Sequence, residues 1–98
     1  MMMELLILTA KKSPCRYRIA ALGLKDGKVV CKAFNLPRMN YQGGGLHAEI
    51  NLLRKNCDID SIVIARVSKT GLLCKIEPCV ACKKLLNKMR IKVYKVVP

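Results

Sequence analysis

One histidine, one glutamate and two cysteines stand at spacings that suit metal-assisted hydrolysis. His47, the single histidine among 98 residues, lies shortly after three consecutive glycines and two positions before Glu49. Cys79 and Cys82 form a C-x-x-C pair directly after Pro78. A lone histidine is usually structural, and C-x-x-C alone also fits a redox dithiol, half of a zinc ribbon or two core cysteines. Together these residues supply an imidazole, two thiolates and a carboxylate, which favours a zinc site.

Three protein ligands on zinc leave the fourth tetrahedral position to water, whose pKa then falls from about 15.7 to about 7. Both parts of the pattern are expected at helix N-termini, where the helix dipole favours the thiolate forms of Cys79 and Cys82. In a first helical turn, Glu49 can reach the same cavity as His47 and carry protons. The alternative for Glu49 is a charge that only complements the helix dipole.

The order of these residues resembles the cytidine and deoxycytidylate deaminase superfamily, which includes the tRNA adenosine deaminases. The stretches 47–50 (His-Ala-Glu-Ile) and 77–82 (Glu-Pro-Cys-Val-Ala-Cys) carry the resemblance, which covers nearly all of residues 1–98. It implies Zn²⁺ held by His47, Cys79 and Cys82. It also implies that Glu49 moves protons while hydroxide attacks the carbon that bears the amine of a base.

The resemblance leaves the substrate open. It implies that Asn35 and Ala48 contact the substrate, although Asn35 also suits a turn stabilised by its own backbone bonds. The leading hypothesis is a cytosine nucleoside or nucleotide, with Arg38 as a phosphate contact. The rival is an adenosine of tRNA or a base of single-stranded nucleic acid. A different class of hypothesis is a structural zinc module, with Cys74 as a fourth, closing ligand.

Helices and strands that could position these residues follow from periodicity and turn signals. The Asp26-Gly27 pair predicts a tight hairpin turn. An unbroken apolar run at 61–67 predicts a strand buried on both faces, as in a parallel sheet. We expect helices over 4–12, 47–55 and 78–90, strands over 17–24, 29–34, 61–67 and 91–97, an extended segment over 72–76, and a loop over 35–45 that lines the site.

Apolar spacing predicts which helix faces enter the core. Leu5 and Leu8 are expected on the packed side of the first helix. The second helix is expected to pack through positions 46, 50, 53 and 57, and the third through positions 79, 82, 86 and 89. The remaining cysteines, at 15, 31, 57 and 74, are interpreted as small buried hydrophobic residues. The last strand carries Lys92 and Lys95, which places it near a sheet edge.

The pattern of elements predicts one α/β domain over residues 1–98, a cytidine deaminase-like three-layer α/β/α fold with a mixed four-stranded sheet. A hydrophobic content of 52% supports one core at this length. The apolar segment at 1–10 is too short to span a bilayer, so it is expected to be a packing helix and no membrane is expected as a partner.

Nineteen Lys and Arg against six Asp and Glu give a net charge of +13. Such a charge favours anionic partners, and phosphate-bearing substrates and nucleic acid both fit this description. The alternative is that the charge serves solubility alone. The metal-type cysteine spacing favours a reducing cytoplasm over a secreted disulfide framework. Because relatives commonly continue past the last strand, we expect a homo-oligomer that covers this edge.

Overall fold

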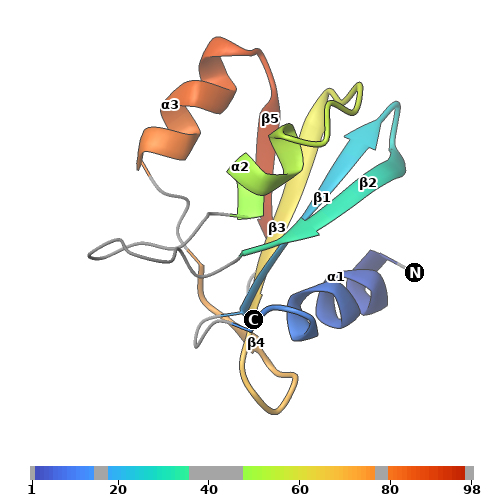
Figure 1. Ribbon diagram of the computed structural model, residues 1–98, viewed down its shortest axis with the longest axis vertical. Helices are drawn as coiled ribbons and strands as arrows, with labels where there is room; N and C mark the ends of the chain where they lie inside the picture. Colours follow the sequence, from blue (N-terminus) through green and yellow to red (C-terminus); the bar gives the residue numbers. More distant parts are fainter. Residues whose placement is uncertain (1, 15–17, 36–47, 77–79, 97–98) are drawn as a thin grey trace.

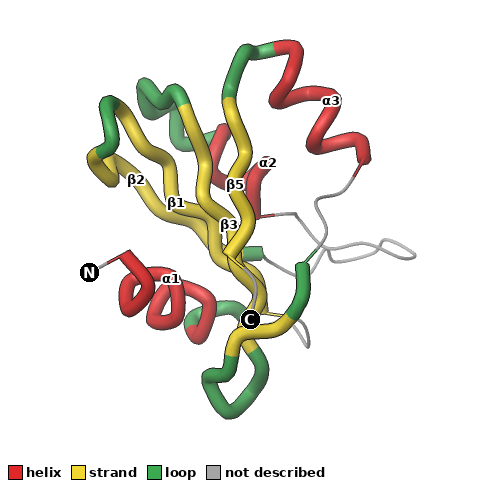
Figure 2. Tube along the Cα trace, turned by 180° about the vertical axis from the view of Figure 1, so that it is seen from behind, coloured by secondary structure: helices red, strands yellow, loops and turns green. Residues whose placement is uncertain are grey.

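In the computed structural model, residues 2–14, 18–35, 48–76 and 80–96 are described. They form three layers (Figure 1). Helix α1 (Met2–Lys11) covers one face of a sheet, and helices α2 (Ala48–Leu53) and α3 (Val80–Lys88) lie on the other face. The view from behind shows the same separation of α1 from α2 and α3 (Figure 2). The predicted three-layer α/β/α fold is confirmed.

The sheet consists of β1 (Arg18–Lys25), β2 (Lys28–Phe34), β3 (Ser61–Val67), β4 (Leu73–Cys74) and β5 (Lys92–Val96). Its order is β2-β1-β3-β4, with β5 also paired to β3. Four strands have five residues or more, as predicted, and the two-residue β4 adds a short fifth. Among the described strands, β5 pairs with β3 alone, which agrees with its predicted place near an edge.

Strand β3 has the predicted bounds and is almost entirely buried, but its neighbours differ from the expectation of a parallel sheet. It runs antiparallel to β1 along its whole length and antiparallel to β4 at its end. Only β5 is parallel to it. The unbroken apolar run of β3 therefore reflects helices on both faces of the sheet rather than parallel neighbours on both sides.

The hairpin between β1 and β2 turns at the predicted pair of residues. Asp26 has a φ of 52° and Gly27 a φ of 79°, the positive values that a type I′ turn requires. The register brings Gly23 opposite Cys31, with a bulge between Gly23 and Leu24. The local sequence thus sets the hairpin, as predicted.

Alternate residues of β1 and β3 enter two separate cores, because successive side chains of a strand point to opposite faces. The α1-side core joins the first helix to one face of the sheet, and its members are Leu6, Ala10, Ala20, Leu22, Leu24, Val63, Ala65 and Val67. The α2/α3-side core lies on the other face, and its members are Ala21, Ala33, Ala48, Leu52, Ile62, Ile64, Ile76, Leu86 and Ile91.

Helix α1 is confirmed within two residues at each end, and its predicted packed side is right for Leu5, which packs against the α1-side core, but wrong for Leu8. The buried residues are Leu6, Thr9 and Ala10, whereas Leu8 is 59% exposed and Leu5 only half-buried. Both sets have helical spacing, so periodicity alone does not choose between them. No helix in the described part of the chain is long and apolar enough to cross a membrane.

Helix α2 is shorter than predicted and is rotated about its axis. It ends at Leu53, and the chain then turns through Asn56, which has a φ of 58°. Its buried residues are Ala48, Glu49 and Leu52, while Ile50 and Leu53 are half-buried. Leu53 of the predicted apolar stripe packs against the α2/α3-side core, but the prediction missed Ala48 and Leu52, which are the most buried apolar residues of this helix.

Helix α3 ends at Lys88, close to the predicted end. Of its predicted packed face, Leu86 is fully buried, whereas Met89 is 51% exposed just beyond the helix. The backbone N–H of Ile91 donates to the carbonyl of Leu86, and Arg90 has a positive φ of 59°. This left-handed residue ends the helix and leads the chain directly into β5.

Candidate active site

Helices α2 and α3 begin at the same end of the same sheet face (Figure 1). Ala48, at the start of α2, belongs to the α2/α3-side core together with Ile76, which precedes α3, and Leu86 within α3. The two parts of the sequence motif are about thirty residues apart, yet the packing of this core brings the segments beside them together. The candidate site is therefore located where α2 and α3 begin.

Glu49 occupies the first turn of α2 and is only 4% exposed. A buried carboxylate is costly unless it has a partner or a task, because burial removes it from water. Within the described residues, the ion pair found is Lys25 with Asp58, and it does not involve Glu49. An enclosed carboxylate at the predicted position is the feature that a proton carrier requires.

Hydrogen bonds fix the start of α2 against the end of β2. The side-chain amide of Asn51 donates to the carbonyl oxygen of Phe34 at 2.8 Å. At the other end of the helix, Lys55 Nζ donates to the carbonyl oxygen of Lys32 at 2.6 Å. These two contacts hold the helix that carries Glu49 in one orientation on the sheet.

Asn35, a predicted substrate contact, ties three segments together. Its Oδ1 accepts a hydrogen bond from the backbone N–H of Ile19 at 2.9 Å, and its own N–H donates to the carbonyl of Ile19 at 3.1 Å. Its carbonyl oxygen accepts from Ser13 Oγ at 2.7 Å. These bonds join Asn35 to distant segments rather than to a local turn of its own, and its contact with a substrate stays a prediction.

The other predicted site residues differ in what the structure describes of them. Ala48 is the first residue of α2 and fully buried. Cys82 lies in the first turn of α3, but its side chain is outside the description. His47, Cys79 and Arg38 lie outside the described residues altogether. Within the ranges that the structure covers, no three His, Cys, Asp or Glu residues form a metal-binding group.

Cys74, the alternative fourth ligand, lies on β4 and is half-buried. Its thiol is oriented towards the carbonyl oxygen of Leu72 at 3.6 Å. Cys31 and Cys57 are also half-buried free thiols, so the three described cysteines are less buried than expected, although Cys31 packs against the α2/α3-side core. Cys15 lies outside the described residues.

Sequence analysis missed the residues that position α2. Asn51 sits on a short helix, where the local pattern does not distinguish a polar residue with a partner from one that faces solvent, and Ser13 follows the end of α1. Their partners, Phe34 and Asn35, are distant in the chain. Nothing in the local sequence signals these bonds, because they depend on how β2 and the two helices meet.

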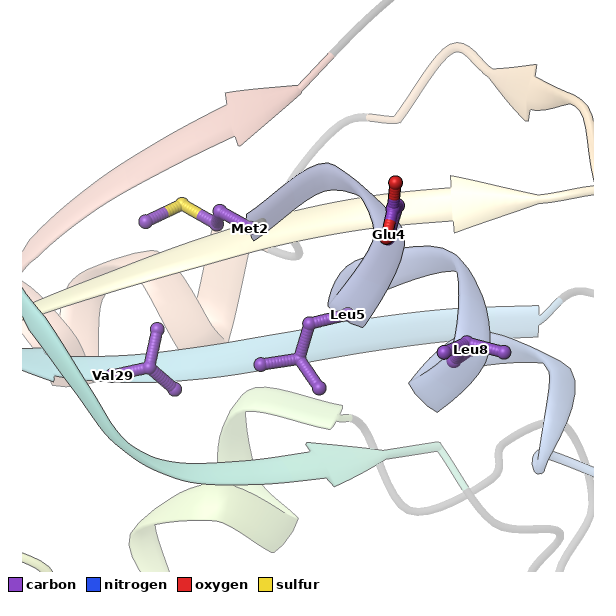
Figure 3. A pocket seen from close by; sticks show the side chains of 5 residues that line it. All are labelled: Met2, Glu4, Leu5, Leu8 and Val29. Carbon is purple, nitrogen blue, oxygen red and sulfur yellow. The ribbon is translucent and has the colours of Figure 1, made fainter.

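A groove of about 510 Å³ opens on the other side of the molecule, between α1 and β2 (Figure 3). Its lining consists of Met2, Glu4, Leu5, Leu8 and Val29. This lining is apolar apart from one carboxylate, so it offers neither metal ligands nor an enclosed proton carrier. The groove does not compete with the start of α2 and α3 as the candidate active site.

Solved structures with a similar fold include cytidine deaminases and a dCMP deaminase. Cytidine deaminase from Mycobacterium leprae shares 16% identity, with 93% of this chain and 82% of that chain covered and a TM-score of 0.68. The dCMP deaminase from the cyanophage S-TIM5 shares 21% identity over 95% and 77%, with a TM-score of 0.69. Cytidine deaminase from Mycobacterium tuberculosis shares 22% identity over 93% and 79%, with a TM-score of 0.61. These similarities define the chain as a cytidine deaminase-like fold.

The family described as the cytidine and deoxycytidylate deaminase zinc-binding region matches residues 1–97. The chain belongs to this family. No curated protein matches it. Membership confirms the resemblance inferred from the motif, and the family's description as a zinc-binding region supports Zn²⁺ as the cofactor.

Proposed function

We propose that this protein catalyses the zinc-dependent hydrolytic deamination of a nucleobase. The observation that carries the proposal is the enclosure of Glu49, 4% exposed, in the first turn of α2. Glu49 follows His47 by two residues, and α2 shares a core with the segment leading to Cys79 and Cys82. Family membership over nearly the whole chain supports an enzyme rather than a binding module.

His47, Cys79 and Cys82 would hold the zinc ion. One imidazole and two thiolates are a donor set that zinc favours, and three protein ligands suit a catalytic rather than a closed site. When bound, zinc supplies a nucleophile at neutral pH by lowering the pKa of water. The first turns of α2 and α3 contribute N–H groups and positive dipole ends that favour the thiolate form of the cysteines.

Glu49 would carry the protons of the reaction. A carboxylate oxygen of Glu49 accepts a proton from the attacking water, and the oxygen adds to the ring carbon that bears the exocyclic amine. The same carboxyl group then donates this proton to the departing nitrogen, so that the products are a carbonyl compound and ammonia. Burial of Glu49 keeps bulk water away from the transfer.

The proposed substrate is cytosine in a nucleoside or nucleotide. The similar solved structures are a dCMP deaminase and cytidine deaminases, which supports small pyrimidine substrates. Arg38 would contact a substrate phosphate, and Asn35 and Ala48 would contact the nucleoside. Ala48 is the first residue of α2 and directly precedes Glu49, which supports its assignment beside the reacting base.

The exposed basic surface at the end of the chain favours a second candidate, a base in tRNA or in single-stranded nucleic acid. Residues 80–96 contain no acidic residue, and six cations in them are exposed: Lys83, Lys84, Lys88, Arg90, Lys92 and Lys95. Tyr94, 53% exposed on β5, lies among them. Such a surface can track a phosphate backbone, although one aromatic ring makes a small platform for stacking.

Ammonia release should be measured with dCMP, CMP, cytidine, adenosine, single-stranded DNA and tRNA as substrates. Turnover of CMP or dCMP supports the first candidate, and turnover of tRNA or DNA alone supports the second. Glu49→Gln should lower kcat by about 100- to 10,000-fold while leaving the zinc content intact. Glu4→Gln is a matched control, because Glu4 is also in a first helical turn but is exposed. Full activity of the Glu49→Gln variant would exclude the proton-carrier role.

A closed structural zinc site is the competing hypothesis. It requires the Cys74 thiol as a fourth ligand, leaves no position for water and gives Glu49 no role. Zinc content and X-ray absorption of Cys74→Ser distinguish the two hypotheses. We expect two sulfur ligands and full zinc content in both the parent and the variant. A third sulfur ligand in the parent, lost in the variant, would establish the structural site instead.

The proposal also includes a homo-oligomer and a cytoplasmic location. Strand β5 pairs on one side only within the described sheet, so a second copy could cover that edge. The metal-type spacing of Cys79 and Cys82 supports a reducing compartment. Sedimentation at micromolar concentration tests the assembly, and a stable species of 11.0 kDa would count against it.

A further inference from the structure

Two thiols outside the candidate active site lie against one another. Cys31 is on β2, and Cys57 follows the turn that ends α2. Cys31 Sγ and the side chain of Ile59, two residues after Cys57, both lie against the position of Gly23. The Cys57 side chain acts on the pKa of the Cys31 thiol, and both thiols are free and half-buried. Neither belongs to the H-x-E or C-x-x-C motif, and the proposed reaction uses neither.

The backbones that carry the two thiols are held together closely. Cys31 pairs across the hairpin with Gly23. A Cβ atom at Gly23 would lie 2.7 Å from Cys31 Sγ and 2.8 Å from Ile59 Cγ2, so only glycine fits beneath the pair of segments. Lys55 Nζ, two residues before Cys57, donates to the carbonyl of Lys32 at 2.6 Å. The strand that carries Cys31 and the segment that carries Cys57 are therefore both held close to one another.

We propose that Cys31 and Cys57 are a redox modification site that forms an intramolecular disulfide on reaction with a low-molecular-weight disulfide such as oxidised glutathione. The Cys57 thiolate attacks one sulfur of the reagent and releases one glutathione thiolate. The Cys31 sulfur then attacks the Cys57 sulfur of the mixed disulfide and releases the second. Two cysteine thiols are oxidised, one reagent disulfide is reduced to two thiols, and the two cysteine protons pass to the products.

Accessibility makes Cys57 the first nucleophile. It lines an open surface depression of about 310 Å³ together with Asn56, Asp58 and Met89, among others. A glutathione molecule can enter such a depression from solvent. Cys31 instead packs partly against the α2/α3-side core.

The environment of Cys31 suits the second, resolving step. Burial raises its pKa to about 11, and the hydrogen bond and charge of the Cys57 side chain add to this effect. Cys31 therefore stays protonated at neutral pH while Cys57 reacts. Once the Cys57 sulfur carries glutathione, its contribution is removed, and the Lys55 ammonium group, which lowers the pKa of Cys31, favours the attacking thiolate.

The disulfide would close a loop that contains α2 and Glu49. Residues 31–57 run from β2 through the end of that strand to α2 and its terminal turn. A covalent link at these ends restricts the unfolded chain and fixes α2 to β2 more firmly. The oxidised protein should therefore unfold at a higher temperature, by about 10 °C or more.

Peptide mapping of the zinc-loaded, full-length protein gives a direct test, because trypsin separates the cysteines. Cys31 falls in peptide 29–32, Cys57 in 56–66, Cys74 in 70–75 and the C-x-x-C pair in 76–83. After incubation with oxidised glutathione, we expect peptide 29–32 linked to peptide 56–66. Cys31→Ser and Cys57→Ser should abolish this product, and Cys57→Ser should also prevent glutathionylation at position 31. Cys74→Ser is the matched control and should leave the product unchanged.

Thermal unfolding gives a second readout that does not depend on deamination. The oxidised parent and the oxidised Cys74→Ser variant should share the increase in Tm, and a reductant should reverse it. Stable glutathione adducts at Cys57 without a link to Cys31, or a Cys57 link to another cysteine, would overturn the proposal. Loss of deaminase activity on its own would bear only on the proposed function.

Discussion

The helices on the two faces of the sheet share a feature of their first turns but differ in how much of it is buried. Both α1 and α2 have a glutamate in the first turn. Glu4 of α1 is exposed beside an apolar groove (Figure 3), whereas Glu49 of α2 is 4% exposed where α2 and α3 begin. A first-turn glutamate complements the helix dipole in either position. Only its surroundings make one of them suitable for chemistry.

The buried polar groups differ between the faces as well. On the α1 side, Thr9 Oγ1 is buried, and within the described structure it has no hydrogen-bond partner. On the α2 side, Asn51 is bonded to Phe34, and the Cys31 and Cys57 thiols contact one another. The buried hydroxyl of Thr9 on α1 thus has no described partner, whereas the α2 face combines apolar packing with polar groups in fixed positions.

The largest expected effects on stability come from replacing one buried leucine on each face by alanine. Leu6 and Leu52 are 0% and 1% exposed, so Leu6→Ala and Leu52→Ala should each lower the free energy of unfolding by about 2–5 kcal/mol. Urea denaturation measures both. Activity per folded molecule should fall only for Leu52→Ala, because Leu52 anchors the helix of Glu49. An equal loss of kcat in Leu6→Ala would remove the functional distinction between the faces.

A methyl group at Gly23 should disturb the α2 side specifically. The new Cβ atom would lie 2.7 Å from Cys31 Sγ, too close for an ordinary contact. Gly23→Ala should therefore cost about 1–3 kcal/mol of stability. In the Cys31→Ala background the cost should be smaller, since one of the two close neighbours is gone. Equal losses of unfolding free energy in both backgrounds, measured by urea denaturation, would show that the Cys31 side chain does not clash with a methyl group at this position.

Substitutions of buried polar residues should change the stability of the protein in opposite directions on the two faces. Asn51→Ala removes the donor to the Phe34 carbonyl and should destabilise the protein by about 1–2 kcal/mol. Thr9→Val replaces a buried hydroxyl without a partner by a methyl group and should be neutral or stabilising by about 1 kcal/mol. Chemical denaturation of both variants measures these changes. Destabilisation by Thr9→Val would mean that the hydroxyl has an undetected role.

The smallest effect is expected at the hairpin turn, away from both cores. The backbone N–H of Asp26 donates to Asp60 Oδ2 at 3.0 Å, which, with a weaker contribution from Ser61, lowers the pKa of Asp60 below 3.8. A lowered folded-state pKa stabilises the fold above pH 3.8, and this stabilisation is lost as the pH falls through the folded value. Asp60→Asn should thus be slightly less stable than the parent at neutral pH.

The stability difference between the parent and Asp60→Asn should shrink as the pH is lowered below 3.8. Denaturation midpoints of both proteins across this range test the prediction. A difference that is independent of pH would indicate that charge at Asp60 contributes nothing. Deaminase activity should be the same in both, because this turn is far along the chain from Glu49 and belongs to neither helix.

Periodicity and turn chemistry predicted much of the fold. The Asp26-Gly27 turn and the bounds of β3 agree with the structure at every residue, because positive φ values and a buried apolar run are local properties. The packed side of α1 was wrong at Leu8, and the length of α2 was wrong. Both depend on how a helix sits on the sheet, which neighbouring residues along the helix do not determine.

For the candidate site, the sequence by itself determined the residue types and their spacing: the H-x-E and P-C-x-x-C motifs that the family match supports. The roles of His47, Glu49, Cys79 and Cys82 and the substrate contacts of Asn35, Ala48 and Arg38 remain predictions. Only the tertiary structure decided that Glu49 is enclosed while Glu4 is not, and that Cys31 meets Cys57. Burial and contact depend on strand register and helix placement, which join residues far apart in the chain and are therefore invisible to local sequence patterns.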